Sequence, residues 1–202
     1  MVLKKQTIKI DRFLPWILII TGVIGLICSF VLAHDQIRIW QDPSYIPACN
    51  LNPVVSCGSV INSKQGHIFG IPGPFYGFIL FPVLATIGIV SRVGSKLPRW
   101  FWLALTGGAF VGFLYASWLF FISVYKVHAL CPFCLITDVV VYLAFWYITL
   151  FVIQQNYIVL PKAFSAFKSF IFRHHLDILL LWYVVIIIFI LHHFWYYYGK
   201  HI

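Results

Sequence analysis

Five apolar stretches of this sequence are each long enough to cross a lipid bilayer as a helix. A hydrocarbon core about 30 Å thick needs roughly 20 apolar residues. The composition agrees, because 62% of the residues are hydrophobic and only 9% are charged, whereas soluble domains carry about 25% charged residues. We therefore predict an all-α integral membrane protein with five transmembrane helices, forming one membrane domain over residues 1–202. The expected spans are Phe13–Ala33, Pro74–Val90, Phe101–Val124, Leu135–Ile153 and Leu176–Tyr196.

The lysines and arginines are distributed unevenly among the segments that join these stretches. When the N-terminus is placed in the cytoplasm, ten of the 14 lie on the cytoplasmic side and four on the outer side. Because basic residues accumulate in cytoplasmic loops, this bias predicts a multi-pass protein of the cell inner (cytoplasmic) membrane. It also explains the net charge of +9 without a nucleic-acid partner. The ten are Lys4, Lys5, Lys9, Arg12, Arg92, Lys96, Arg99, Lys162, Lys168 and Arg173, and the four are Arg38, Lys64, Lys126 and Lys200.

The longest segment outside the expected spans covers residues 34–73, on the outer side, and contains Cys49 and Cys57. Loops longer than about 15 residues are uncommon unless they are functional or disordered. This segment is rich in aromatic and aliphatic side chains, which argues against disorder. We expect it to fold as an external cap over the outer end of the helices.

A second cysteine pair, Cys131 and Cys134, lies on the same side, where the fourth expected span begins. Pro132 suits the first position of a helix. The N-terminus of a helix carries partial positive charge, which favours a thiolate and lowers the pKa of a cysteine there. The motif therefore indicates dithiol–disulfide exchange. A structural disulfide or half of a zinc site are the alternatives.

Cys49 and Cys57 are separated by seven residues, a spacing that permits a disulfide within the cap. Such a bond would stabilise the loop by roughly 2–3 kcal/mol, and that is the purely structural interpretation. A four-cysteine zinc site is a further alternative, but structural zinc sites usually use two closely spaced pairs. No metal site is therefore expected. Cys28 falls inside the first span, where we expect it to pack as a small hydrophobic residue.

The order and spacing of these features resemble the vitamin K epoxide reductase family, in its bacterial disulfide-forming branch. The resemblance covers roughly Trp16–Phe151. It is carried by the two cysteine pairs in this order, by Ser63, and by Phe69 and Gly70 before the second span. Many bacterial relatives carry a fused thioredoxin-like domain after the fifth helix. Here only Gly199–Ile202 follow the last aromatic residues, so any such partner is expected to act in trans.

This resemblance implies a four-helix core over residues 13–154 around a quinone, ubiquinone or menaquinone, with a fifth helix at residues 174–198 alongside it. Electrons would pass from a thioredoxin-fold (DsbA-like) protein to the cap pair, then to the helix pair, and then to the quinone. By position, Cys49 would meet the partner and Cys57 would exchange with Cys131. Cys134 would then face the quinone.

Four further residues are candidates for contact with the quinone. Asp138 lies one helical turn past Cys134, and an ionisable residue at membrane depth is a functional candidate. His128 precedes the motif by three residues and is able to stabilise a thiolate or deliver a proton. Phe133 lies within the motif, and by the resemblance Ser63 is a polar contact that orders the cap.

The favoured interpretation is a quinone-dependent thiol oxidase that forms disulfide bonds outside the cytoplasmic membrane. In one alternative, the same cysteines reduce vitamin K quinone or its epoxide. The animal epoxide-reducing enzymes have a tyrosine where this chain has Asp138, which argues against epoxide as the natural substrate. The other alternative is a non-enzymatic membrane scaffold with structural disulfides, or a haem or metal carrier. The His174–His175 and His192–His193 doublets fit an interfacial position better, because adjacent helical residues point about 100° apart.

Overall fold

The computed structural model of the chain describes residues 10–52, 54–63, 66–158 and 165–198. Several residues used above therefore lie outside the described part: Lys4, Lys5, Lys9, Lys64, Lys162 and Gly199–Ile202.

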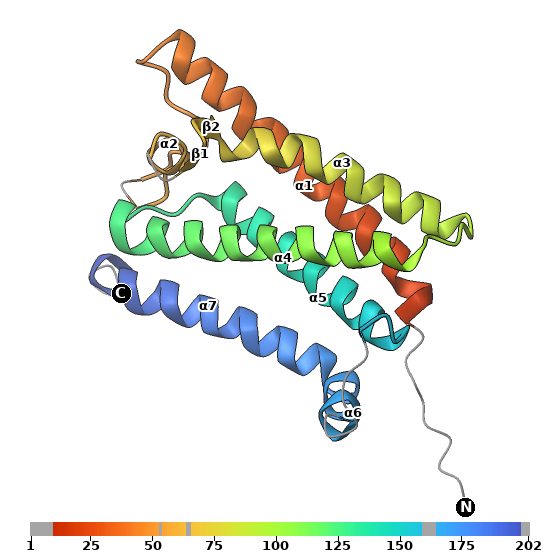
Figure 1. The fold of residues 1–202 in the computed structure, drawn as a ribbon. Coiled ribbons are helices and arrows are strands. Elements are labelled where there is room, and N and C mark those ends of the chain that lie inside the picture. The colour runs from red at the N-terminus through yellow and green to blue at the C-terminus, as the bar shows by residue number, and fades with distance from the viewer. Residues whose placement is uncertain (1–9, 53, 64–65, 159–164, 199–202) are drawn as a thin grey trace, which may run out of the picture.

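Five helices are long and apolar enough to span a membrane, as predicted (Figure 1). They are α1 (Ile10–Gln41), α3 (Gly73–Arg92), α4 (Arg99–Ile122), α5 (Pro132–Gln154) and α7 (His175–Tyr198). The smaller elements are α2 (Cys57–Ile61), α6 (Ser165–Arg173), a π-helical turn η2 (Ser123–Val127) and a hairpin of β1 (His67–Ile68) with β2 (Ile71–Pro72). The prediction of an all-α membrane protein is confirmed.

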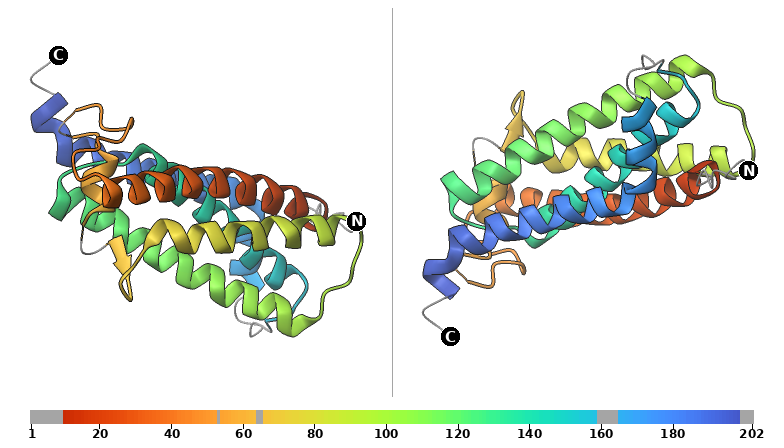
Figure 2. Two further views of the ribbon diagram at one scale, coloured as in Figure 1. Left: turned by 90° about the horizontal axis from the view of Figure 1, so that it is seen from above. Right: turned by 90° about the horizontal axis from the view of Figure 1, so that it is seen from below.

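Four of the long helices form the core of the bundle. The first, α1, packs along α3 and α5, and α5 in turn packs against α4. The two views in Figure 2 show these helices running along a common direction, with α7 beside them. Buried side chains such as Leu18, Ile148 and Leu150 form one hydrophobic cluster of this core. In the same cluster the Trp102 and Phe151 rings lie 4.4 Å apart between centroids.

Helix α1 is longer than the hydropathy pattern predicts. The expected span ends at Ala33, but the helix continues to Gln41, so residues 34–41 are helical rather than part of a loop. Polar side chains end the apolar pattern there without breaking the backbone hydrogen bonds, and the next proline after Pro15 comes only at Pro43. The extension matters for the site, because Asp35 and Gln36 on it are buried, at 6% and 1% exposure.

Glycine at position 22 lets α1 lie directly against α3. A Cβ atom added at Gly22 would lie 2.7 Å from the backbone nitrogen of Ala85 and 2.9 Å from its Cα atom. Membrane helices use small residues in this way to bring two backbones close together. Since the obstructing atoms belong to a helix backbone, they cannot rotate aside as a long side chain can.

We expect Gly22→Ala to lower the free energy of unfolding by about 1–3 kcal/mol, the usual cost of overpacking. The matched control is Gly107→Ala on α4, where the structure describes no atom within 4 Å of an added Cβ. That control should be neutral or slightly stabilising, because alanine favours a helix more than glycine does. Thermal unfolding of the purified variants in detergent measures both effects. An equal loss in the two variants would contradict the packing role of Gly22.

Candidate redox site

The cap contains a disulfide between Cys49 and Cys57, as the spacing allowed. The chain turns tightly between them, since the Asn52 Oδ1 atom accepts hydrogen bonds from the backbone N–H groups of Val54 and Val55, at 2.9 and 2.7 Å. The Asn50 Oδ1 atom accepts a third from the N–H of Gly58 at 3.0 Å. Asparagine side chains thus replace regular secondary structure in holding this turn.

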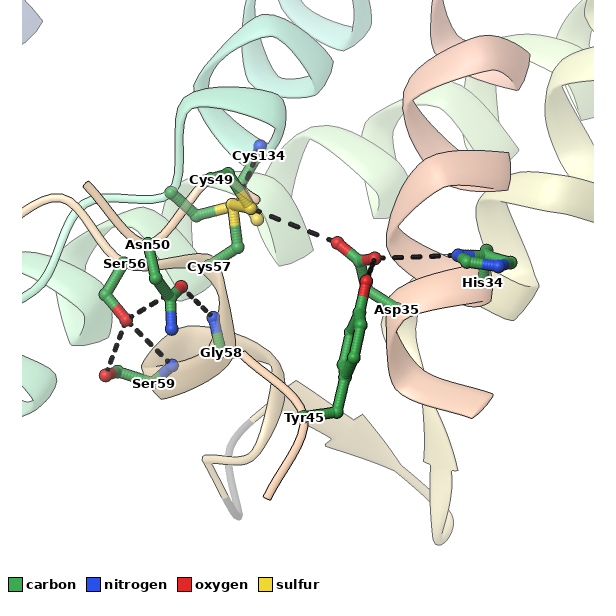
Figure 3. Close-up of a disulfide and its surroundings, with 11 residues drawn as sticks. His34, Asp35, Tyr45, Cys49, Asn50, Ser56, Cys57, Gly58, Ser59 and Cys134 are labelled. Carbon is green, nitrogen blue, oxygen red and sulfur yellow. Dashed lines mark hydrogen bonds and ion pairs between the residues drawn. A yellow bond between two sulfur atoms is a disulfide. The ribbon is translucent and has the colours of Figure 1, made fainter. Parts of the chain in front are cut away.

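Helix α2 begins at the second cysteine of the cap pair. Ser56 is its N-cap, and the serine Oγ atom accepts a hydrogen bond from the backbone N–H of Ser59 at 3.2 Å. The same hydroxyl donates to Asn50 Oδ1 at 3.2 Å (Figure 3). Capping and turn contacts therefore share Asn50 and Ser56, which fixes where Cys57 lies relative to Cys49.

The second pair stands at the start of α5, as predicted from the motif. Cys131 is the N-cap of this helix and Pro132 occupies its first turn. The Cys131 Sγ atom accepts a hydrogen bond from the backbone N–H of Cys134 at 3.3 Å. The Cys131 sulfur is therefore held at the start of the helix, among backbone N–H groups that have no partner within the helix.

Backbone hydrogen bonds join the cap to the segment that precedes α5. The N–H of Ser56 donates to the Leu130 carbonyl at 2.9 Å, and the N–H of Leu130 donates to the Val54 carbonyl at 2.7 Å. Val55 and Leu130 thereby form an isolated parallel bridge. Cys57 follows Val55 by two residues, and Cys131 follows Leu130 directly.

The two cysteine pairs share one buried apolar cluster as a result. Cys57 is fully buried and Cys131 is 1% exposed, while Cys49 is 8% exposed. Cys134 is packed against the same cluster but is only partly buried. The remaining members of the cluster come from α1, from α2 and from the turn before α5: Leu32, Val60, Ile61 and Ala129.

An acidic side chain on α1 also reaches the cap disulfide. The Asp35 Oδ2 atom lies 4.0 Å from the Cys49 Sγ atom, and Asp35 Oδ1 accepts a hydrogen bond from the Tyr45 hydroxyl at 3.0 Å (Figure 3). This bond to a carboxylate raises the pKa of Tyr45. Sequence reasoning missed Asp35, because the residue falls just past the apolar stretch and was assigned to the loop. The only signal in the sequence that could have identified Asp35 was an acidic residue just past the end of an apolar stretch.

A cavity of about 580 Å³ opens inside the four-helix core, next to the α5 pair. Its wall is mostly apolar, with a few polar groups, among them Ser29, Tyr115, Thr137 and Asp138. Cys134 lies on this wall, whereas Cys131 is absent from the described lining. A cavity of this size with few polar groups is typical of a site for an apolar small molecule, and it suits a quinone ring.

The predicted quinone contacts divide into two groups. Cys134 and Asp138 line the cavity, but Phe133, Ser63 and His128 are not among its described lining residues. Phe133 instead packs on the cysteine cluster. The Ser63 hydroxyl donates to the Val60 carbonyl at 2.7 Å and accepts from the N–H of Gly66 at 3.1 Å, so it orders the cap.

His128 ends the π-helical turn in a left-handed conformation, with φ of 57°. Its ring lies edge-on to His193 of α7, with 5.2 Å between the centroids. Two residues that sequence reasoning did not select, Tyr76 and Tyr115, line the cavity. They lie within α3 and α4, where no motif marks them.

A comparison with known protein families adds one finding. The model of the family described as "Vitamin K epoxide reductase family" matches residues 16–149, more than half of the chain. The matched region runs from α1 to α5 and contains both cysteine pairs, whereas α6 and α7 follow it.

Proposed function

Because the chain belongs to the vitamin K epoxide reductase family, whose members are membrane oxidoreductases, we propose that it is a quinone-dependent thiol oxidase. It forms disulfide bonds in a thioredoxin-fold partner that acts in trans and passes the electrons to a membrane quinone.

One observation carries this proposal. The bridge between Val55 and Leu130 brings Cys57 and Cys131 into one buried cluster, and Cys134 lies on the cavity wall. A disulfide that only stabilised the cap would not need a second cysteine pair within the same cluster. The arrangement supports a relay that begins at the cap disulfide and ends at a membrane cavity.

In the first half of the relay, the partner supplies two thiols. One partner thiolate attacks Cys49, the Cys49–Cys57 bond breaks, and Cys57 leaves as a thiolate. The second partner sulfur then attacks the first, so the partner departs with a disulfide and Cys49 is released as a thiol. Two electrons and two protons have moved from the partner to the cap.

In the second half, the Cys57 thiolate attacks Cys131, and the Cys131–Cys134 bond breaks with Cys134 as the leaving thiolate. Cys49 then attacks Cys57, which restores the cap disulfide and releases Cys131. The pair on α5 is now reduced. A quinone bound in the cavity would accept two electrons and two protons and restore the disulfide of that pair. Cys134, Asp138 and Tyr115 are the residues that would hold it.

The redox potentials favour this direction. Strong dithiol oxidants of the DsbA type have potentials near about −120 mV, so their regeneration requires a stronger acceptor. A membrane quinone is such an acceptor, and it is reached from within the bilayer. The cavity is lined by residues of the membrane-spanning helices α1, α3, α4 and α5, which suits that requirement.

Anaerobic turnover is the experiment that tests the function. The purified protein is mixed with a reduced thioredoxin-fold protein and a soluble quinone analogue, and loss of partner thiols is followed against loss of quinone absorbance. We expect one quinone to be reduced for each disulfide formed, and no reaction without the enzyme. An enzyme preparation that oxidises no dithiol while both cysteine pairs stay intact would favour the structural-scaffold alternative.

The charge bias also predicts where the cysteines face. With the N-terminus in the cytoplasm, both pairs lie on the periplasmic or outer side of the inner membrane. After reduction, a maleimide that cannot cross membranes should label the cysteines of the pairs in intact cells or right-side-out vesicles. Cys28 lies within the membrane-spanning part of α1, where a reagent that cannot enter the bilayer does not reach it, and it serves as the internal control. Labelling that appears only after the vesicles are opened would reverse the proposed orientation.

A further inference from the structure

Asp35 is a buried acid whose surroundings the relay described so far does not use. It lies on the extension of α1, its Oδ2 atom is 4.0 Å from the Cys49 sulfur, and its Oδ1 atom is held by Tyr45 at 3.0 Å. The guanidinium of Arg38 lies over the Tyr45 ring, 5.3 Å from its centroid. The carboxylate is therefore fixed in place from the α1 side and from the cap side (Figure 3).

The contact between Asp35 and Cys49 has no hydrogen to share in the oxidised protein. Cys49 is bonded to Cys57, and a disulfide sulfur carries no proton. A hydrogen bond becomes possible only after reduction, when Cys49 carries an S–H group that is able to donate. The acceptor is thus in position for a form of the cap that exists only during turnover.

We propose that Asp35 is a catalytic residue of the cap pair, which takes the proton from the Cys49 thiol when this sulfur returns to Cys57. The inference rests on the proposed function, because it concerns the step that restores the cap disulfide. A positioned carboxylate is a suitable base for a thiol within hydrogen-bonding distance.

The step balances without any further reactant. Cys57 is bonded to Cys131, and Cys49 carries a thiol. As the Cys49 proton moves to Asp35, the Cys49 sulfur attacks Cys57 and forms the cap disulfide. The Cys57–Cys131 bond breaks, and its electron pair leaves with Cys131 as a thiolate at the start of α5. Asp35 then gives up its proton to solvent, and the exposed His34 ring, with Nδ1 3.6 Å from Asp35 Oδ1, is placed to accept it.

The expected loss of rate follows from the fraction of an unassisted thiol that is ionised at a given pH. An unassisted thiol with a pKa of about 8.5 is roughly 3% ionised near pH 7, so loss of the base is expected to slow cap closure by about 30-fold. Near pH 9 most of the thiol is ionised without help, and the deficit should shrink to less than about twofold. The other titratable or charged groups around Asp35 are His34, Arg38 and Tyr45.

The test compares Asp35→Asn with Asp42→Asn. The first variant keeps an oxygen that accepts the Tyr45 hydrogen bond but cannot take a proton. The second removes the same charge from the same end of the protein. Hydrogen bonds from Ser44 lower the pKa of the Asp42 carboxyl in the unaltered protein, so Asp42 is ionised across the assay range. Asp42 makes no described contact with sulfur. Oxidation of a reduced thioredoxin-fold protein by a soluble quinone analogue is measured near pH 7 and near pH 9, with the thermal midpoint of each variant.

We expect Asp35→Asn to be about 30-fold slow near neutral pH and to recover near pH 9, while Asp42→Asn follows the unaltered protein. A pH-independent loss, or a loss that tracks a lowered thermal midpoint, would make Asp35 purely structural and overturn the inference. Wild-type rates in Asp35→Asn would overturn it as well. Cys49→Ala, assayed in parallel, keeps the two proposals apart: an active Cys49→Ala enzyme refutes the relay, whereas an inactive one beside a fully active Asp35→Asn refutes only the role of Asp35.

Discussion

Replacing Cys49 with alanine is expected to abolish oxidation of a thioredoxin-fold substrate, by on the order of a thousand-fold or more, since no other sulfur takes its place in a covalent relay. Reduction of the quinone by dithiothreitol should stay partly intact. Of the four paired cysteines, Cys134 is the one that lines the membrane cavity, and a small dithiol is able to reach it where a folded partner cannot. The two activities of one variant therefore separate the two halves of the relay.

The measurement follows quinone absorbance with each reductant in turn. Cys28→Ala is the matched control, since this cysteine is buried on α1 and is outside both pairs. It should retain both activities. If Cys49→Ala lost the two activities to the same extent, the order in which electrons pass from the cap to α5 would be wrong.

Hydropathy predicts the number of membrane helices because the bilayer permits almost no other apolar structure of that length. It predicts their ends less well. Helix α1 runs eight residues past Ala33, since a helix ends where its hydrogen bonds end and not where its side chains become polar. Asp35 therefore appeared to be a loop residue, and its position beside Cys49 was not predicted.

The meeting of the two cysteine pairs could be expected from the family resemblance but not from the cap sequence alone. It depends on the pairing of Val54–Ser56 with Leu130, which are more than 70 residues apart in the chain. Nothing in the local pattern of either segment marks it as the partner of the other. Asn50 and Asn52 are of a residue type that favours turns, and the structure shows which backbone N–H groups their side chains bind.

Helical periodicity explains which of the predicted quinone contacts line the cavity. Asp138 follows Cys134 by one turn and shares its face, so both reach the cavity. Phe133 is adjacent to Cys134 and points about 100° away, which directs it to the cysteine cluster. His128 was chosen because it is close to the motif in sequence. The left-handed conformation of His128 itself, however, directs its ring toward His193 of α7.

The two cysteines of α5 should fail in different ways when each is replaced. Cys131 lies in the cluster with Cys57, and Cys134 lines the cavity, about one helical turn or 5 Å deeper along the axis. We expect Cys134→Ala to accumulate a disulfide between Cys57 and Cys131. The Cys131 thiolate attacks Cys57, the Cys49–Cys57 bond breaks and Cys49 leaves as a thiol, while the Cys134 sulfur that would displace Cys57 from Cys131 is missing. Mass spectrometry of a non-reduced peptide digest detects this bond. Turnover should fall to background, at least about a thousand-fold.

In Cys131→Ala, the expected result is a free thiol at Cys134 and no bond to the cap. Cys134 should react with a membrane-permeant maleimide, and a soluble quinone analogue should slow that reaction because it fills the cavity beside the sulfur. The same analogue should not protect Cys28, which is buried on α1 outside the described cavity lining. Two results together would show that the assigned roles of the pair are wrong. The first is a Cys57–Cys134 disulfide in Cys131→Ala at the same yield as the Cys57–Cys131 disulfide in Cys134→Ala. The second is that the analogue gives Cys134 no protection. Each sulfur would then be within reach of the cap, and the depth of Cys134 along α5 would not separate exchange from quinone reduction.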